Sequence, residues 1–205
     1  MDYPKINVMD TIKDGIQLAL KNVLSLILLV ILYVLTVWIP YLNVGTTVGL
    51  YKAVIAMSRG EVVDPVSIFD KENFKFFGNM FLLLGFQTVG ITAASAFIFV
   101  PGIILSIAWG FAMYLLIDRG VSPLKALTAS YDITLGEKWR IFAIGLLVGL
   151  IIGLVSGLFS LIPKVGFVFS ILIGIVGGAL SVAVQALMFR HFEDKYDAMK
   201  EAGEI

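Results

Sequence analysis

The side chains of this chain that could act as catalysts or ligands are few and lie far apart. There is no cysteine and one histidine, His191, which follows Arg190 at the end of a long apolar stretch. Asp118 and Arg119 form a second charged group at the end of another apolar stretch, where an interfacial ion pair is more common than catalysis. The motifs of zinc proteases, serine hydrolases and phosphate-binding loops do not occur. The sequence therefore predicts a non-enzymatic protein with no catalytic, cofactor-binding or metal-binding residue.

A second set of candidates consists of uncharged polar side chains inside the apolar stretches: Asn43, Gln87, Thr88 and Gln185. Such amides and hydroxyls usually bridge neighbouring helices in a membrane. They are also the residues that would line a pathway for a polar solute, and we leave both interpretations open. No ionisable group lies near the middle of these stretches, which argues against proton-driven transport and voltage sensing.

The composition indicates which elements must position these side chains. Hydrophobic residues make up 59% of the chain and charged residues 15%, whereas soluble domains are about half apolar and a quarter charged. A membrane-spanning helix needs roughly 20 apolar residues. Six stretches approach that length: Val23–Ile39, Tyr41–Ser58, Phe76–Val100, Gly102–Ile117, Ile141–Ile162 and Val165–Phe189. We therefore predict an all-α integral membrane bundle of six transmembrane helices.

The distribution of charge predicts the orientation of this bundle. The turns after Ile39, Val100 and Ile162 contain one charged residue, Lys164, while the other lysines and arginines lie in the terminal segments and the two longer loops. Basic residues favour the cytoplasmic side, so both termini are predicted to be cytoplasmic in a multi-pass inner membrane protein. The 15 basic and 15 acidic residues balance, and no basic stripe suggests a nucleic-acid partner.

The turns also suggest an internal repeat within a single transmembrane domain, residues 1–205. Pro40, Pro101 and Pro163 occupy similar outer turns about 60 residues apart, a period that suits a repeated unit. The predicted repeats are 1–60, 61–120 and 121–192, followed by a short charged tail, 193–205. Each repeat would consist of an amphipathic cytoplasmic helix and a transmembrane hairpin, giving three hairpins.

Three amphipathic segments support this unit. The segment after Ser122 places Leu124, Leu127, Tyr131 and Leu135 on one face. The N-terminal segment has a similar apolar stripe, and the residues after Pro65 form a weaker third copy. Helices of this kind lie along a membrane surface, so we expect all three at the cytoplasmic interface.

Glycines recur at intervals of four in one apolar stretch, at Gly145, Gly149, Gly153 and Gly157. Small residues let membrane helices approach closely, and the next stretch carries its own small residues at Ser170, Gly174 and Gly178. The first interpretation is that these two stripes pack together within one chain. Self-association through the same stripe and a pore lining are the alternatives.

Residues 101–147 resemble a broad group of membrane proteins, the YciC-like proteins and the membrane domain fused to some glycerophosphodiester phosphodiesterases. The features that carry the resemblance are Pro101, Gly102, Ala126, Leu127, Ser130, Gly136 and Phe142. Elsewhere only the hydropathy pattern is similar. The resemblance implies about six helices, and it implies no catalytic residue in this chain.

The favoured function is that of a membrane component that acts through lipids, a membrane protein partner or a homo-oligomer. Lys125, Lys138 and Arg140 are predicted to form a basic patch that contacts anionic lipid headgroups, because each basic residue near such a surface contributes about 1 kcal/mol. The competing function is a small-solute channel or transporter, formed around a pseudo-threefold axis or by an oligomer. Polar residues from each repeat meeting at one place would favour the competitor, and an apolar, closed centre would favour the first function.

Overall fold

The computed structural model describes residues 3–97, 99–162 and 165–205, and this part of the chain is helical with no β-strand. The predicted all-α class is confirmed. The predicted outer turn at Pro163 and Lys164 lies outside the described residues. The elements are α1 (Val8–Lys21), α2 (Val23–Thr36), α3 (Leu42–Ser58), the 3₁₀ helices η1 (Pro65–Phe69) and η2 (Lys71–Phe76), α4 (Phe77–Phe97), α5 (Phe99–Ala108), α6 (Ala112–Arg119), α7 (Pro123–Ile133), α8 (Lys138–Ser160) and α9 (Gly166–Glu201).

Four helical segments in the described residues are long and apolar enough to cross a membrane: Lys71–Ala96, Phe99–Arg119, Lys138–Ser160 and Gly166–Glu201. A fifth would require α1 and α2 to form one span, although they are bent by 89° where they meet. The 17-residue α3 is not among these segments. The chain therefore has the helices of a membrane protein, but six spans in three equal hairpins are not confirmed.

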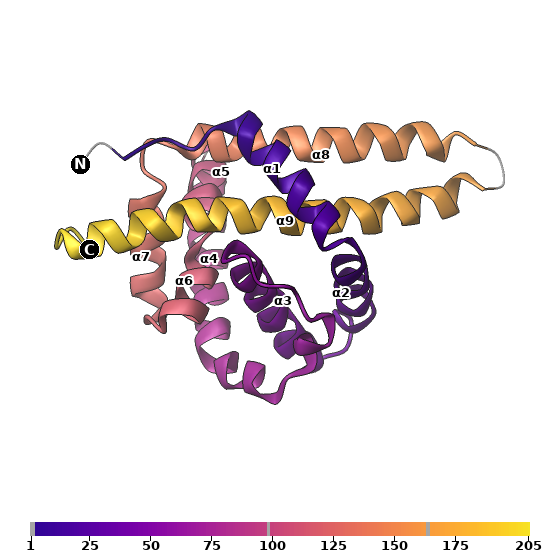
Figure 1. Cartoon of the computed structure of the whole chain (residues 1–205). Helices are drawn as coiled ribbons and strands as arrows, with labels where there is room; N and C mark the ends of the chain where they lie inside the picture. Colours follow the sequence, from indigo (N-terminus) through magenta and orange to yellow (C-terminus); the bar gives the residue numbers. More distant parts are fainter. Residues whose placement is uncertain (1–2, 98, 163–164) are drawn as a thin grey trace.

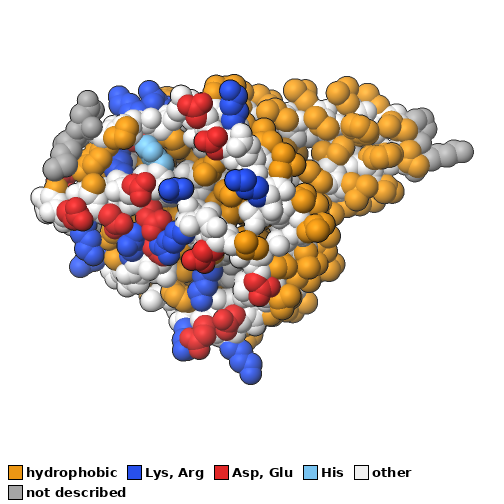
Figure 2. All heavy atoms as spheres, viewed as in Figure 1, with side chains coloured by type: hydrophobic (Ala, Val, Ile, Leu, Met, Phe, Trp, Pro, Cys, Tyr) orange, Lys and Arg blue, Asp and Glu red, His pale blue; other side chains and the backbone are white. Residues whose placement is uncertain are grey.

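Helix α9 runs through the whole molecule, and α1, α2, α3 and α8 pack along it (Figure 1). Its N-terminal half and α8 form a hairpin that projects from the body, with exposed Leu154, Leu158 and Phe167. Hydrophobic side chains cover this projecting end, whereas acidic and basic side chains gather at the opposite end (Figure 2). An apolar surface this extensive is typical of contact with lipid rather than water.

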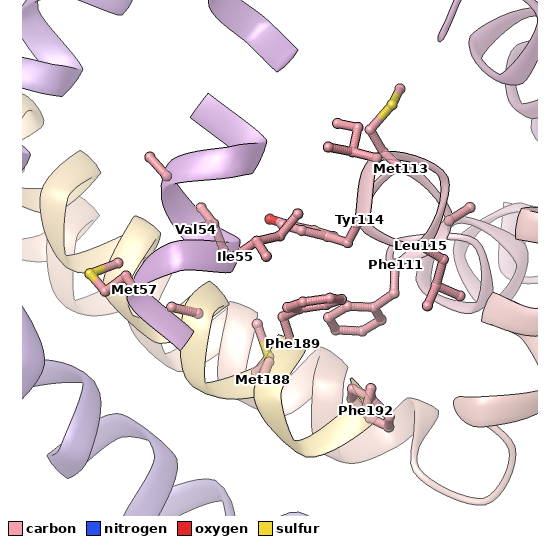
Figure 3. Close-up of a cluster of buried hydrophobic side chains, with 14 of the residues drawn as sticks. Val54, Ile55, Met57, Phe111, Met113, Tyr114, Leu115, Met188, Phe189 and Phe192 are labelled. Atoms are coloured by element: carbon pink, nitrogen blue, oxygen red, sulfur yellow. The ribbon is translucent and has the colours of Figure 1, made fainter. Parts of the chain in front are cut away.

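The core of the body contains a cluster of aromatic rings, surrounded by aliphatic side chains, where α3, α6 and α9 meet (Figure 3). The Phe111 ring lies 4.7 Å from that of Phe192, and the Tyr114 ring stacks 5.0 Å from that of Phe189. Phe189 and Phe192 are completely buried. Because each buried aromatic ring removes a large apolar area from solvent, these rings hold α6 against α9.

The predicted amphipathic helices at the N-terminus and after Ser122 are confirmed as α1 and α7, but they are packed into the protein. The hydroxyl group of Ser130 in α7 donates a hydrogen bond to the Ala108 carbonyl (2.7 Å) and accepts one from the Phe111 amide (3.2 Å). This side chain satisfies the backbone at the break between α5 and α6. Leu127 is buried, whereas Leu124 remains 60% exposed, so only part of the predicted apolar face is free for lipid.

The third predicted amphipathic helix, after Pro65, is instead a pair of 3₁₀ helices folded along α3. A Cβ atom at Gly45 would overlap the ring of Phe74, and one at Gly49 would overlap the backbone of Ile68. Glycine at both positions is what lets η1 and η2 lie against α3. The sequence pattern missed this packing because a helix periodicity cannot show which residue must lack a side chain.

The same packing does not fit one part of the predicted topology, the assignment of Tyr41 and Phe74 to opposite sides of the membrane. The ring of Tyr41, assigned to an outer turn, stacks 5.1 Å from that of Phe74, which belongs to a predicted cytoplasmic loop. Phe77, at the start of α4, also lies 6.0 Å from Tyr41. A hydrocarbon core of about 30 Å cannot separate groups that touch, so these two segments cannot lie on opposite sides of the membrane.

The predicted glycine packing is wrong within the single chain. A Cβ atom added at Gly145, Gly149, Gly153, Gly157 or Gly174 would meet no other atom within 4 Å. Helices α8 and α9 do pack together, but through Gly177, where a Cβ atom would lie 2.7 Å from Ile152. Gly178 faces Val30 of α2 instead. The Ser170 hydroxyl bonds to the Gly166 carbonyl within α9 (3.0 Å) and also reaches the Ser156 carbonyl of α8 (3.5 Å), so this member of the predicted stripe does contact α8. The four-residue period was read correctly, but it marks a face of α8 that is open in the described part of the chain.

The contact between Tyr41 and Phe74 predicts that the turn before α3 and the η2 segment are accessible from the same side of the membrane. The chain has no cysteine, so Trp38→Cys and Glu72→Cys can each be labelled alone in proteoliposomes with a membrane-impermeant maleimide. Both positions are exposed. We expect labelling from the same face, and labelling from opposite faces would restore the sequence-based topology.

The glycine contacts predict a matched pair of stability effects. Gly49→Ala should lower the free energy of unfolding by about 1–3 kcal/mol, because the new methyl group has no space beside Ile68. Gly153→Ala should cause no loss, because its surroundings are open. Thermal unfolding in detergent measures both, and equal melting temperatures for the two variants would contradict the packing of η1 on α3.

Candidate functional site

A buried carboxylate, Glu137 in the loop before α8, joins three distant parts of the chain. It is 2% exposed and accepts hydrogen bonds from the backbone amide of Ile6 (2.7 Å) and from the Lys195 ammonium group (3.0 Å). Nε2 of His191 lies 3.1 Å from the same carboxylate. Arg140 completes the arrangement by donating to the Ile6 carbonyl (2.9 Å). The N-terminal segment is thus held to α8 and α9 through the backbone amide and carbonyl groups of Ile6.

The environment of Glu137 changes its acidity. Burial by itself raises the pKa of the carboxyl group. The hydrogen bonds from His191, the Ile6 amide and Lys195 outweigh this effect and lower the pKa to about 2. The charged form is therefore the stable one, since each donor favours the carboxylate. These polar groups satisfy one another, which identifies the site as a structural junction.

A second charged cluster joins the C-terminal ends of α3 and α6 to α9. The Arg59 guanidinium group contacts Asp118 (2.5 Å) and Glu193 (2.6 Å). Arg119 contacts Glu193 (2.9 Å) and Asp197 (2.8 Å). The adjacent Asp118 and Arg119 are also paired, at 2.9 Å, as the sequence suggested. Because the ends of α3 and α6 meet α9 here, the cluster fixes the relative positions of the three helices.

An apolar groove of about 370 Å³ lies between α5 and the start of α8. Helix α5 contributes four aliphatic side chains, and the other wall begins at the loop before α8. The lining residues are Val100, Ile103, Ile104, Ile107, Gly136, Lys138, Trp139 and Phe142. The only charged group among them is the ammonium group of Lys138, which lies 4.1 Å from the centre of the Tyr131 ring. The groove thus combines a long apolar surface with a single cation.

The three basic residues predicted to form one lipid-binding patch have different surroundings. Lys138 lines the groove, Arg140 is bonded to the Ile6 carbonyl, and Lys125 is exposed on α7 but is not a lining residue. Among the predicted headgroup contacts, Lys138 alone therefore combines charge with an adjoining apolar cavity.

A second, more polar pocket of about 250 Å³ lies among α2, α3, α6 and α9. Its hydrogen-bonding residues are Tyr33, Thr47, Tyr51, Tyr114, Ser181 and Gln185, with Leu50, Val54 and Val182 completing the lining. They come from all three predicted repeats. On the side of the aromatic core, the pocket is closed by the ring of Tyr114, which stacks on buried Phe189. The two features expected to separate the competing functions, convergent polar groups and an apolar centre, therefore occur together.

The four residues predicted to mark a polar pathway do not meet. Only Gln185 lines the pocket. Gln87 donates to the Trp109 carbonyl (2.8 Å), which is the helix-bridging role expected of most such amides. Thr88 is exposed on α4, and Asn43 lies in the first turn of α3. One of the four thus identified a cavity, while the tyrosines beside it were missed, because no spacing in the sequence places them near Gln185.

Comparison with protein-family models, curated proteins and solved structures gave no match. The resemblance of residues 101–147 to the YciC-like group therefore stays a prediction.

The Glu137 junction predicts a specific dependence of stability on pH. A folded-state pKa of about 2, against the usual 4.5, means that the stabilisation is complete above pH 4.5 and is lost as the pH falls toward 2. The shift in pKa corresponds to about 3 kcal/mol in the free energy of unfolding at neutral pH. We expect Glu137→Gln to lower the melting temperature at pH 7 and to flatten its decline below pH 4.5.

Glu201→Gln is the matched control, because Glu201 is an exposed carboxylate at the end of α9. This variant should retain the wild-type dependence on pH. If Glu137→Gln also follows the wild-type curve, the buried carboxylate does not hold the N-terminal segment in place.

Proposed function

We propose that this protein is a non-enzymatic membrane protein that acts through an anionic lipid bound in the groove between α5 and α8. The observation that carries the proposal is the position of Lys138 in the lining of an otherwise apolar groove. An acyl chain would lie along the aliphatic side chains of α5, and the phosphate would lie beside the ammonium group. Trp139, which is 73% exposed, suits the headgroup region, where tryptophan is enriched.

The location of the groove supports a lipid rather than a soluble ligand. Lys138 is the first residue of α8, a candidate span, and Glu137 immediately before it is fixed by the charged junction. One wall of the groove therefore starts at the boundary between the charged and apolar parts of the molecule. At the corresponding depth in a bilayer, the phosphate group of a lipid can contact the ammonium group while its acyl chain stays in the apolar region.

We propose a topology in which the projecting hairpin of α8 and α9 spans the membrane, with the start of α5 at the depth of Lys138, because Val100 and Lys138 line the same groove. Both termini and all the basic clusters would then lie on the cytoplasmic side of the inner membrane. Helix α3 supports this arrangement, because Arg59 at one end joins the charged cluster and Tyr41 beside the other end contacts Phe74 of the charged η2 segment. With charged segments at both ends, α2 and α3 would form a cytoplasmic interfacial unit instead of a hairpin across the bilayer.

The proposal predicts selective retention of anionic lipid. In native mass spectrometry of protein released from mild detergent, wild type should retain phosphatidylglycerol in preference to phosphatidylcholine. Lys138→Gln should reduce that preference several-fold, because one cation near the phosphate is worth about 1 kcal/mol. Ile104→Trp, which fills the groove without changing charge, should reduce retention of both lipids.

The matched control is Lys13→Gln, which removes an exposed lysine on α1 that does not line the groove. This variant should retain phosphatidylglycerol like wild type. Equal retention by the Lys138 and Lys13 variants would overturn the proposal, and the same spectra report whether a homo-oligomer forms.

A further inference from the structure

The polar pocket among α2, α3, α6 and α9 has a chemistry that the lipid groove does not share. Two hydrogen bonds between side chains span it: the Tyr114 hydroxyl donates to Oε1 of Gln185 (3.2 Å), and the Tyr33 and Thr47 hydroxyls lie 3.4 Å apart. Four different helices supply the lining. Polar groups from several segments that converge on one cavity are the usual form of a small-molecule site.

The lining excludes most charged ligands. No side chain among the described residues that line the pocket carries a charge, and an ion taken from water without a partner loses several kcal/mol of solvation. What the pocket offers instead is hydroxyl groups, which both donate and accept hydrogen bonds, and an amide. With Oε1 of Gln185 engaged by Tyr114, the amide NH₂ group of Gln185 is the part that can donate to a ligand.

Aromatic faces complete this chemistry. The Tyr51 and Tyr114 rings meet edge to face, with centres 4.6 Å apart, at the wall between α3 and α6. Figure 3 shows the Tyr114 hydroxyl pointing toward α3. A ring presents an apolar surface beside its polar hydroxyl, which matches a molecule whose C–H groups and hydroxyl groups alternate. Polyols and sugars have this character.

We infer that the pocket lined by Thr47, Tyr114 and Gln185 is a binding site for a neutral polyhydroxyl group. That group is presented either by a free polyol or sugar or by the headgroup of a neutral glycolipid. The inference does not depend on the lipid groove between α5 and α8, which shares no lining residue with this pocket.

Saturation-transfer NMR on the whole protein tests this inference in a detergent that lacks a sugar headgroup. The probes are D-glucose, glycerol and hexyl β-D-glucoside, with glucose 6-phosphate as the charged comparison. Wild type should transfer saturation to D-glucose or hexyl glucoside and bind glucose 6-phosphate at least tenfold more weakly. Binding of D-glucose identifies a free solute as the ligand, and binding of hexyl glucoside alone identifies a glycolipid headgroup.

A matched pair of variants separates binding in the pocket from partition into the micelle. Thr47→Val removes a pocket hydroxyl and should weaken binding about fivefold, whereas Thr88→Val removes an exposed hydroxyl of α4 and should leave it unchanged. Gln185→Leu should weaken binding at least tenfold, and Tyr114→Phe checks the result with the aromatic packing retained. The inference is overturned if wild type binds none of the neutral probes, or if Thr47→Val and Gln185→Leu bind them like wild type.

Discussion

A single continuous helix, α9, has an apolar, exposed end and a charged end, and the rest of the structure is arranged around this division. Its first half packs with α8 as an apolar hairpin, and its second half carries His191, Glu193 and Lys195, which form the charged contacts. Between these halves, Ser181 and Gln185 line the polar pocket and Phe189 enters the aromatic core. Lipid-facing surface, cavity, core and charged junction therefore follow one another along one helix.

The charged junctions determine where the proposed lipid site begins. Glu137 is buried at the point where the loop after α7 turns into α8, and its three donors come from α9 and the N-terminal segment. Since a buried carboxylate without donors would be strongly destabilising, the first turn of α8 is held in one position. Lys138 and Trp139 follow directly, so the same contacts that stabilise the fold also orient one wall of the groove.

Composition and periodicity were sufficient to predict a helical membrane protein, the helices α1 and α7, and the bridging role of Gln87. They could not predict contacts between distant segments. Gly49 matters because Ile68 lies against it, and the four glycines from Gly145 to Gly157 have the expected spacing but open surroundings. Glu137 lies in a short polar loop, and its partners are more than 50 residues away in either direction. The spacing of residues in the sequence shows which of them share one face of a helix. Which segment packs against that face depends on the whole fold.

The most direct test of the central claim is a density map of the protein in nanodiscs that contain phosphatidylglycerol. The account predicts an acyl chain along Ile103 and Ile107, with a phosphate group within hydrogen-bonding distance of the Lys138 ammonium group. A groove closed by movement of α5 toward α8, or an empty groove with ordered lipid only on the projecting α8–α9 hairpin, would contradict it.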